Sequence, residues 1–174
     1  KGTRAHNAQL VLEAKPFVTQ PSETAGNFVK DPSFEIAATP LADWTITTAG
    51  MASSTLVRTT AGSKYGTAAL EISGSSVDAA TATASRRQTI STAVASAGTF
   101  SAFVSVHPIA LSNFRAELIL RFSNATGSNQ SVATSTTTGT SFVQLSITTL
   151  TATASGTAIM ILSLTGISGT GSGT

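Results

Sequence analysis

The sequence predicts an all-β protein: an antiparallel two-sheet β-sandwich (jelly roll) with an N-terminal strand or arm. Short strand-like segments recur between turns rich in Gly, Ser and Thr, and no stretch shows the periodicity of an amphipathic helix. Of the 174 residues, only 10% are charged and 41% are hydrophobic. This composition favours β-sheets whose surfaces carry small hydroxyl side chains.

Turn and breaker residues divide the chain into three parts. Residues 1–26 form an arm and linker with one strand, residues 27–165 the sandwich, and residues 166–174 a Gly/Ser/Thr tail that we expect to be flexible. Pro16 and Pro21 bracket the linker, because proline cannot continue a β-ladder.

Alternation of apolar and polar residues predicts the strands of the sandwich in order. Two short strands flank an Asp-Pro-Ser turn within 27–35, and further strands fall at 43–47, 54–60, 68–72, 87–91, 99–106, 114–122, 130–136, 141–148 and 157–164, with an exposed loop or edge at 77–85. In strand 114–122, Leu118, Leu120 and Phe122 are expected on one face of the strand. Glu117, Ile119 and Arg121 are expected on the opposite face. The residues expected in the core are Phe34, Trp44, Leu70, Ile90, Phe100, Val104, Leu118, Leu120, Phe142 and Ile161.

Charge and cysteine content exclude several classes of function. The formal net charge is +2 and the basic residues are scattered, so we expect no nucleic-acid partner. Without cysteines, neither a disulfide framework nor a thiolate metal site can form. No signal-like apolar run follows Lys1, and the longest apolar run, 158–162, is too short to span a bilayer, so we expect no membrane partner. Because Lys1 is not Met, we interpret the chain as a piece of a longer protein.

Few residues are candidates for a functional site. Tyr65 lies in a loop flanked by glycines and is the candidate ligand-binding residue, whereas Trp44 alternates with Ile46 and is assigned to the core. Glu35 and Asp43 are expected to bind backbone amides or calcium. Glycosidase chemistry needs two facing carboxylates, and nothing in the sequence indicates such a pair. We therefore expect no catalytic residues and no enzymatic activity.

The opening of the sandwich resembles a known family. Residues 27–35, Asn-Phe-Val-Lys-Asp-Pro-Ser-Phe-Glu, resemble the Asn-Leu-x-x-Asn-Pro-Ser-Phe-Glu start of galactose-binding-like jelly rolls. These are the carbohydrate-binding modules of bacterial xylanases and cellulases, and similar domains occur in minor tail proteins of phages that infect actinobacteria. Trp44 and the segments 66–70, 87–90 and 98–104 follow in the same order, so the resemblance covers about residues 27–165.

The resemblance implies a ligand site and a metal site that this sequence matches only in part. Sugar-binding members present Trp or Tyr as stacking platforms; Trp44 stands where the family buries a core tryptophan, which leaves Tyr65. Members often hold a structural Ca²⁺ between residues near the opening Phe-Glu and an acidic pair in a closing strand. No such strand follows Leu164, so Glu35 alone matches the motif, and a structural Ca²⁺ is the one cofactor to consider.

Two functions follow from these observations. The first is a non-enzymatic structural or adhesion module of a phage tail or similar virion surface assembly. Its partners would be other virion subunits, including further copies of this chain, and it would act in host attachment. The second is a genuine carbohydrate-binding module for a cell-surface or plant polysaccharide, located at an extracellular surface. The scarcity of aromatic platforms favours the first.

The arm resembles the closing strand of the same family. Residues 7–13 are similar to an Asp-Asn-x-x-Leu-Val strand, with His6 in place of the Asp. The arm either ends a preceding module or fills an open sheet edge in this or a neighbouring subunit. We predict that Leu10 and Leu12, or else Val11, are buried in a β-ladder.

Overall fold

The computed structural model describes most of the sandwich and one strand of the arm. The described residues are 7–11, 29, 34, 41–60, 63–64, 66–76, 79–94, 98–124, 127–137, 139–152 and 155–167, without the side chains of 7–11, 79 and 91–94. Within these ranges the elements are β1 (Asn7–Val11), β2 (Thr45–Ala49), β3 (Ser53–Thr59), β4 (Ala69–Ser75), η1 (Ala79–Thr81), β5 (Thr83–Val94), β6 (Thr99–Pro108), β7 (Phe114–Asn124), β8 (Gly127–Ser135), β9 (Val143–Thr151) and β10 (Gly156–Gly166). None of the helical segments among them is long or apolar enough to cross a membrane.

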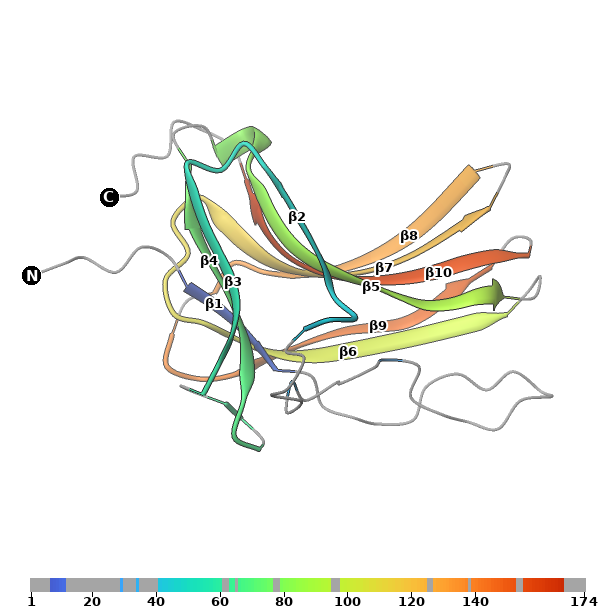
Figure 1. Cartoon of the computed structure of the whole chain (residues 1–174), viewed down its shortest axis with the longest axis horizontal. Helices are drawn as coiled ribbons and strands as arrows, with labels where there is room; N and C mark the ends of the chain where they lie inside the picture. The colour runs from blue at the N-terminus through green and yellow to red at the C-terminus, as the bar shows by residue number, and fades with distance from the viewer. Residues whose placement is uncertain are drawn as a thin grey trace, which may run out of the picture.

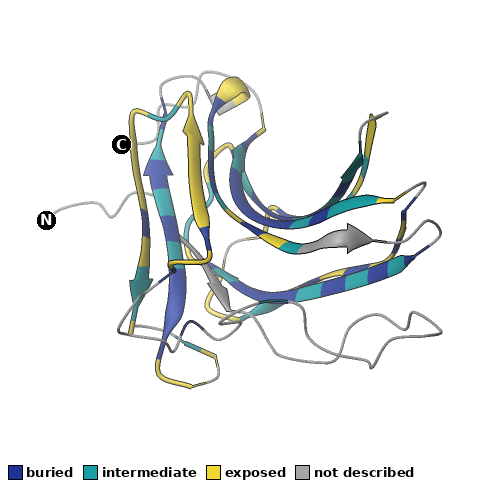
Figure 2. Cartoon of the chain, turned by 45° about the vertical axis from the view of Figure 1, so that its right-hand side comes forward, coloured by how far each residue is buried: buried dark blue, intermediate teal, exposed yellow. Residues whose placement is uncertain are grey.

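The strands form two five-stranded antiparallel sheets, which confirms the predicted all-β sandwich (Figure 1). The first sheet has the order β3-β4-β1-β6-β9, and the second has the order β2-β5-β10-β7-β8. The second sheet bends along its strands. Its convex face is turned toward the first sheet, and its other face, which we call the outer face, is concave (Figures 1 and 2).

The core lies between the sheets and follows the alternation of the strands. On β7, the predicted inward set of Leu118, Leu120 and Phe122 is fully buried. On β10, the buried set is Met160, Leu162 and Leu164, which belongs to the same apolar cluster. Because successive side chains of a strand point to opposite faces, the intervening residues of β7 and β10 lie on the outer face. Figure 2 shows this alternation of burial along the strands.

Three of the four aromatic residues assigned to the core are buried there. Phe34 and Trp44 pack with ring centroids 5.6 Å apart, and Phe100 belongs to the same cluster. Phe142 does not: it is half-buried, outside the core cluster, and its ring lies 5.1 Å from that of His107. The assignment of Phe142 was wrong because Phe142 precedes β9 and lies out of phase with Leu145 and Ile147, the first core residues of that strand.

Two other expectations need correction. Ile161 is buried but lies outside the core cluster, because its neighbours Met160 and Leu162 are the residues of β10 that point inward. The predicted loop at 77–85 contains η1 and the start of β5, with Ala82 and Ala84 in the core. Small alanines have weak strand patterning, and only packing against the other sheet shows that they are interior residues.

Arg86 joins the two sheets from the core side of β5. Its guanidinium donates hydrogen bonds to the carbonyl oxygen of Trp44, at 2.7 Å, and to that of Leu56 on β3, at 2.6 Å. Burial lowers the pKa of this guanidinium below its usual value. Trp44 immediately precedes β2 of the second sheet and Leu56 lies on β3 of the first, so Arg86 joins the two sheets at one side of the sandwich.

The arm contributes a central strand. β1 pairs with β4 on one side and with β6 on the other, and Leu10 is the register partner of both Leu70 and Val106. The predicted β-ladder is therefore confirmed for residues 7–11. Of the origins left open for the arm, the structure shows that it supplies a strand to this chain's own sheet, between β4 and β6 rather than at an outer edge. Leu12 and the side chains of residues 7–11 lie outside what the structure describes, so their predicted burial stays a prediction. The domain boundaries at 26 and 165 also remain a prediction.

Candidate functional site

The outer face of the second sheet combines apolar and polar side chains in adjacent rows. Its rows follow from the ladder registers, because directly paired residues of an antiparallel sheet point to the same face. The residues that make up the face are Thr83, Ser85, Arg87 and Thr89 of β5, Ile159, Ile161, Ser163 and Thr165 of β10, Arg115, Glu117, Ile119 and Arg121 of β7, and Gln130, Val132 and Thr134 of β8.

An apolar row crosses the middle of this face. Ile119 is paired with Val132 on one side and with Ile161 on the other. Val132 is 43% exposed, whereas Ile161 is buried by its neighbours. The row continues into Arg87 and ends at Thr45 of the edge strand β2. We call Ile119, Val132 and Ile161 the apolar row. On β7 it is bordered by Glu117 on one side and by Arg121 on the other, and on β10 Ile159 extends it beside Arg121.

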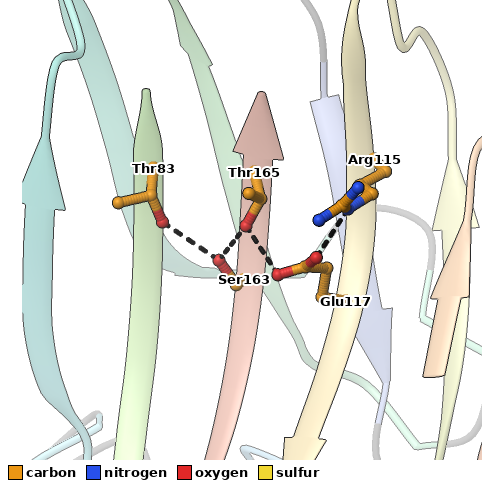
Figure 3. A network of polar contacts seen from close by, with 5 residues as sticks. All are labelled: Thr83, Arg115, Glu117, Ser163 and Thr165. Atoms are coloured by element: carbon orange, nitrogen blue, oxygen red, sulfur yellow. Dashed lines mark hydrogen bonds and ion pairs between the residues drawn. The ribbon is translucent and has the colours of Figure 1, made fainter. Parts of the chain in front are cut away.

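A connected polar network lies on one side of the apolar row (Figure 3). Arg115 Nε donates to Glu117 Oε1 at 2.6 Å, and Thr165 Oγ1 donates to Glu117 Oε2 at 2.7 Å. Ser163 Oγ lies 2.8 Å from Thr165 Oγ1 and 3.2 Å from Thr83 Oγ1. Glu117 is only 4% exposed and Ser163 only 2%, so the centre of the network is buried, whereas the Arg115 side chain at its end is 37% exposed.

The hydroxyl protons of this network have a single consistent direction. Thr165 uses its proton for Glu117, so its oxygen accepts from Ser163. Ser163 has then used its own proton, and Thr83 must donate to it. Three hydroxyls therefore point in sequence toward one carboxylate, an arrangement in which each hydrogen bond polarises the next. Its two ends, the Thr83 oxygen and the Arg115 guanidinium, are the groups positioned to meet a ligand.

A second fixed polar pair borders the apolar row on its other side. Both Nε and a terminal nitrogen of Arg121 donate to Gln130 Oε1, at 3.0 and 2.9 Å. Gln130 is the cross-strand partner of Arg121, so the register itself holds the two side chains together. The face thus presents two ordered polar groups separated by an apolar strip, an arrangement suited to a surface of mixed polarity.

The residues singled out from the sequence are placed elsewhere. Tyr65 and Glu35 lie outside the described residues, and Trp44 is in the core. In the described part of the chain, no group of three or more His, Asp and Glu side chains gathers around a point that could hold a metal ion. The calcium site expected at Glu35 therefore stays a prediction. Asp43 is exposed just before β2.

His107 belongs to the first sheet and is engaged in structural contacts. Its Nε2 lies 3.1 Å from the carbonyl oxygen of Gly139, and its ring contacts Phe142. Lys64 Nζ lies 5.8 Å from the centroid of the Phe142 ring and donates to Ser105 Oγ at 3.2 Å. These contacts tie two loops to β6.

Sequence reasoning placed Glu117 and Arg121 on one face of their strand but did not single out the network. The available signal was a carboxylate and two arginines within an otherwise apolar strand. The partners could not be found in this way, because Thr165 and Glu117 are separated by 48 positions, and Thr83 and Ser163 by 80.

Comparisons with known proteins give one structural likeness. The sequence matches no protein-family model and no curated protein. The structure is similar to a crystal structure described as the enzymatically active domain of tailspike protein 4 from bacteriophage CBA120, with a TM-score of 0.59 and 15% sequence identity. The match covers 82% of this chain and 20% of that chain, so this chain spans about a fifth of the tailspike structure. The all-β fold is thus one that occurs in a phage tail protein, whereas the finer likeness to galactose-binding-like jelly rolls stays a prediction.

The same match corrects the expectation that the chain is not an enzyme. That expectation depended on the lack of an evident carboxylate pair, yet this fold forms part of a domain described as enzymatically active. A fold does not determine a function, and catalytic groups can be added to one scaffold in many ways. The scarcity of acidic residues was therefore an insufficient reason to exclude catalysis.

Proposed function

We propose that this chain is a structural or adhesion module of a phage tail or of a similar virion surface assembly, and that it engages its neighbour through the outer face of the second sheet. The proposal is carried by the composition of the outer face, and it is supported by a fold that also occurs in a tailspike protein. There an apolar row with Val132 exposed lies between two ordered polar groups. Protein interfaces commonly combine an apolar centre with a polar rim.

In the proposed contact, the apolar and the polar residues of the outer face contribute in different ways. Burial of the apolar row contributes about 25 cal/mol for each Å² of apolar surface removed from water. Arg115 and the Arg121–Gln130 pair supply directional hydrogen bonds at fixed places. Because these side chains are already ordered, little further conformational entropy is lost on binding. Glu117, being buried, acts through Arg115 and is a positioning residue.

The first test asks whether the chain is part of a virion. Particles of a phage that encodes this sequence are purified through a density gradient, and their proteins are identified by mass spectrometry. We expect peptides of this chain in the particles, and we expect gold-labelled antibodies against it to mark the tail in electron micrographs. Absence of the chain from infectious particles contradicts the proposal.

The second test asks whether the outer face makes the contact. Val132→Lys places a charge at the exposed end of the apolar row, and Val57→Lys, on β3 of the other sheet, is a matched control because Val57 is 45% exposed. In phage that carry these substitutions, we expect Val132→Lys to lower the amount of the chain per particle and Val57→Lys to leave it unchanged. Equal incorporation of both variants contradicts a role for this face.

Carbohydrate binding is a second candidate, and the exposure of the Arg115 side chain, 37%, favours it. A guanidinium on the same face as an aliphatic strip can bind sugar hydroxyls while the strip contacts the apolar C–H groups of the rings. Binding of the chain to purified bacterial surface polysaccharides, xylan and cellulose is measured by calorimetry, and reducing ends released from the same samples are measured as well. If Arg115→Ala abolishes the binding, the result supports this candidate. If Tyr65→Ala abolishes it instead, the binding site lies in the loop that contains Tyr65. No binding to any of them favours the assembly role.

A further inference from the structure

In the part of the chain that the structure describes, the edge strand β2 has a ladder partner on one side only. It ends the order of the second sheet and pairs with β5 on one side only, and all five of its residues are exposed. The free side of such a strand presents N–H and C=O groups that have no ladder partner. β2 is the last strand of the outer face, but strand pairing there uses its backbone edge rather than the side chains of the apolar row.

Natural sheet edges are usually protected, and β2 lacks the usual devices. Its sequence, Thr-Ile-Thr-Thr-Ala, contains no charged residue and no proline, and its register with β5 is continuous, without a bulge. Threonine and isoleucine both favour β-strands. By contrast, at the opposite side of the sandwich Asn129 of β8 donates to the carbonyl oxygen of Thr151 of β9 at 2.9 Å, so those two edges are tied to each other.

The sequence of β2 is self-complementary. Residues 45–47, Thr-Ile-Thr, read the same in both directions, and Ile46 is 50% exposed. If a second copy of the strand lies antiparallel to the first about a twofold axis at Ile46, the two isoleucines face each other and each Thr45 faces a Thr47. Cross-strand pairs of this kind, aliphatic with aliphatic and Thr with Thr, stabilise antiparallel sheets. Twofold symmetry also closes the assembly at two copies, because the same edge is used by both.

We infer that β2 pairs with β2 of a second copy of this chain, which joins the two second sheets into one continuous ten-stranded antiparallel sheet. The pairing buries Ile46 of both copies and satisfies the free backbone groups of both edges. One pair of short strands makes an interface at the small end of the range for specific complexes, so the dimer forms at high protein concentration or where a larger assembly holds two copies together.

Cysteine cross-linking tests the register directly, because the natural sequence contains no cysteine. A twofold axis at Ile46 brings the two Cβ atoms of an Ile46→Cys dimer within disulfide range. Under mild oxidation we expect Ile46→Cys to form linked dimers at least about tenfold faster than Val57→Cys, an equally exposed position on the other sheet's edge strand. Thr45→Cys and Thr47→Cys should each link slowly alone and rapidly when mixed, because they lie opposite each other. Equal rates at all these positions overturn the inference.

Sedimentation of the chain without added cysteines gives an independent measurement. The average mass is expected to rise toward that of a dimer with increasing concentration, and Ile46→Lys, which brings two like charges face to face, is expected to abolish the rise. Val57→Lys is the control and should leave the rise intact. Both positions are exposed, so both variants should keep the circular-dichroism spectrum and melting temperature of the natural chain. A chain that stays monomeric up to the highest soluble concentration overturns the inference.

Discussion

Both faces of the second sheet contain buried side chains, but these side chains are stabilised by different means on the two faces. On the inner face, Leu118 and Leu162 are fully buried in the apolar core. On the outer face, Glu117 and Ser163 are almost as inaccessible, yet both are polar and both are hydrogen-bonded. The comparison shows that burial alone does not identify a core position. The chemistry of the buried group, apolar or hydrogen-bonded, separates the packing face from the candidate site.

The energetic consequence differs as well. An apolar side chain lost from the inner face leaves a cavity, whose cost grows with its volume. A polar side chain lost from the outer face leaves its partners unsatisfied, at a cost that depends on how easily water replaces it. Since the outer face borders solvent, water can enter there, and smaller effects are expected.

The largest effect is expected on the inner face. Phe122→Ala should lower the free energy of unfolding by about 3–5 kcal/mol, because Phe122 is fully buried among apolar neighbours and the structure can collapse only partly into the space. Urea denaturation followed by tryptophan fluorescence measures the change. An unchanged denaturation midpoint would show that the inner face is not the packing face.

Replacement of Arg86, a polar residue on the core side, should have the next largest effect on the free energy of unfolding. Arg86→Met keeps much of the volume but leaves the carbonyl oxygens of Trp44 and Leu56 without their donor. We expect a loss of about 1.5–3 kcal/mol in the free energy of unfolding, the range for hydrogen bonds to a charged group. Arg86→Lys should recover only part of this loss, because an ammonium group cannot reproduce the planar fork that reaches both carbonyls. Full recovery by lysine would contradict the bridging role.

On the outer face, Glu117→Ala should cost about 1–2 kcal/mol, because Thr165 and Arg115 lose their acceptor but remain close to water. Glu117→Gln should cost less, since an amide oxygen can still accept one of the two bonds. Denaturation of both variants, with and without added salt, separates the ionic part of the effect. If Glu117→Ala is as stable as the natural chain, the network has no structural role.

The smallest effect is expected at the exposed end of the apolar row. Val132→Thr should change the free energy of unfolding by less than about 0.5 kcal/mol, as is usual for an exposed position. The same substitution should weaken the binding of any partner that contacts the apolar row. A larger loss of stability, measured by urea denaturation, would indicate that Val132 is needed for folding, and the row would then be a structural feature rather than a binding surface.

Much of the local structure could be predicted before the fold was known. The alternation in 114–122 correctly separated Leu118, Leu120 and Phe122 from Glu117, Ile119 and Arg121. The expected core positions of Phe34 and Trp44 were also correct. Tyr65 and Glu35, the candidates drawn from family resemblance, lie outside the described residues and remain predictions.

The sequence by itself determined that this chain is built of antiparallel strands, because a period of two and the side-chain preferences are local properties of each segment. Only the tertiary structure decided which strands are neighbours. It placed β1 in the centre of a sheet, turned Phe142 away from the core, and brought Thr83, Ser163 and Glu117 together across three strands. The physical reason is that alternation specifies the face to which a side chain points. The partner strand and its register are set by how the two sheets bury their apolar faces against each other.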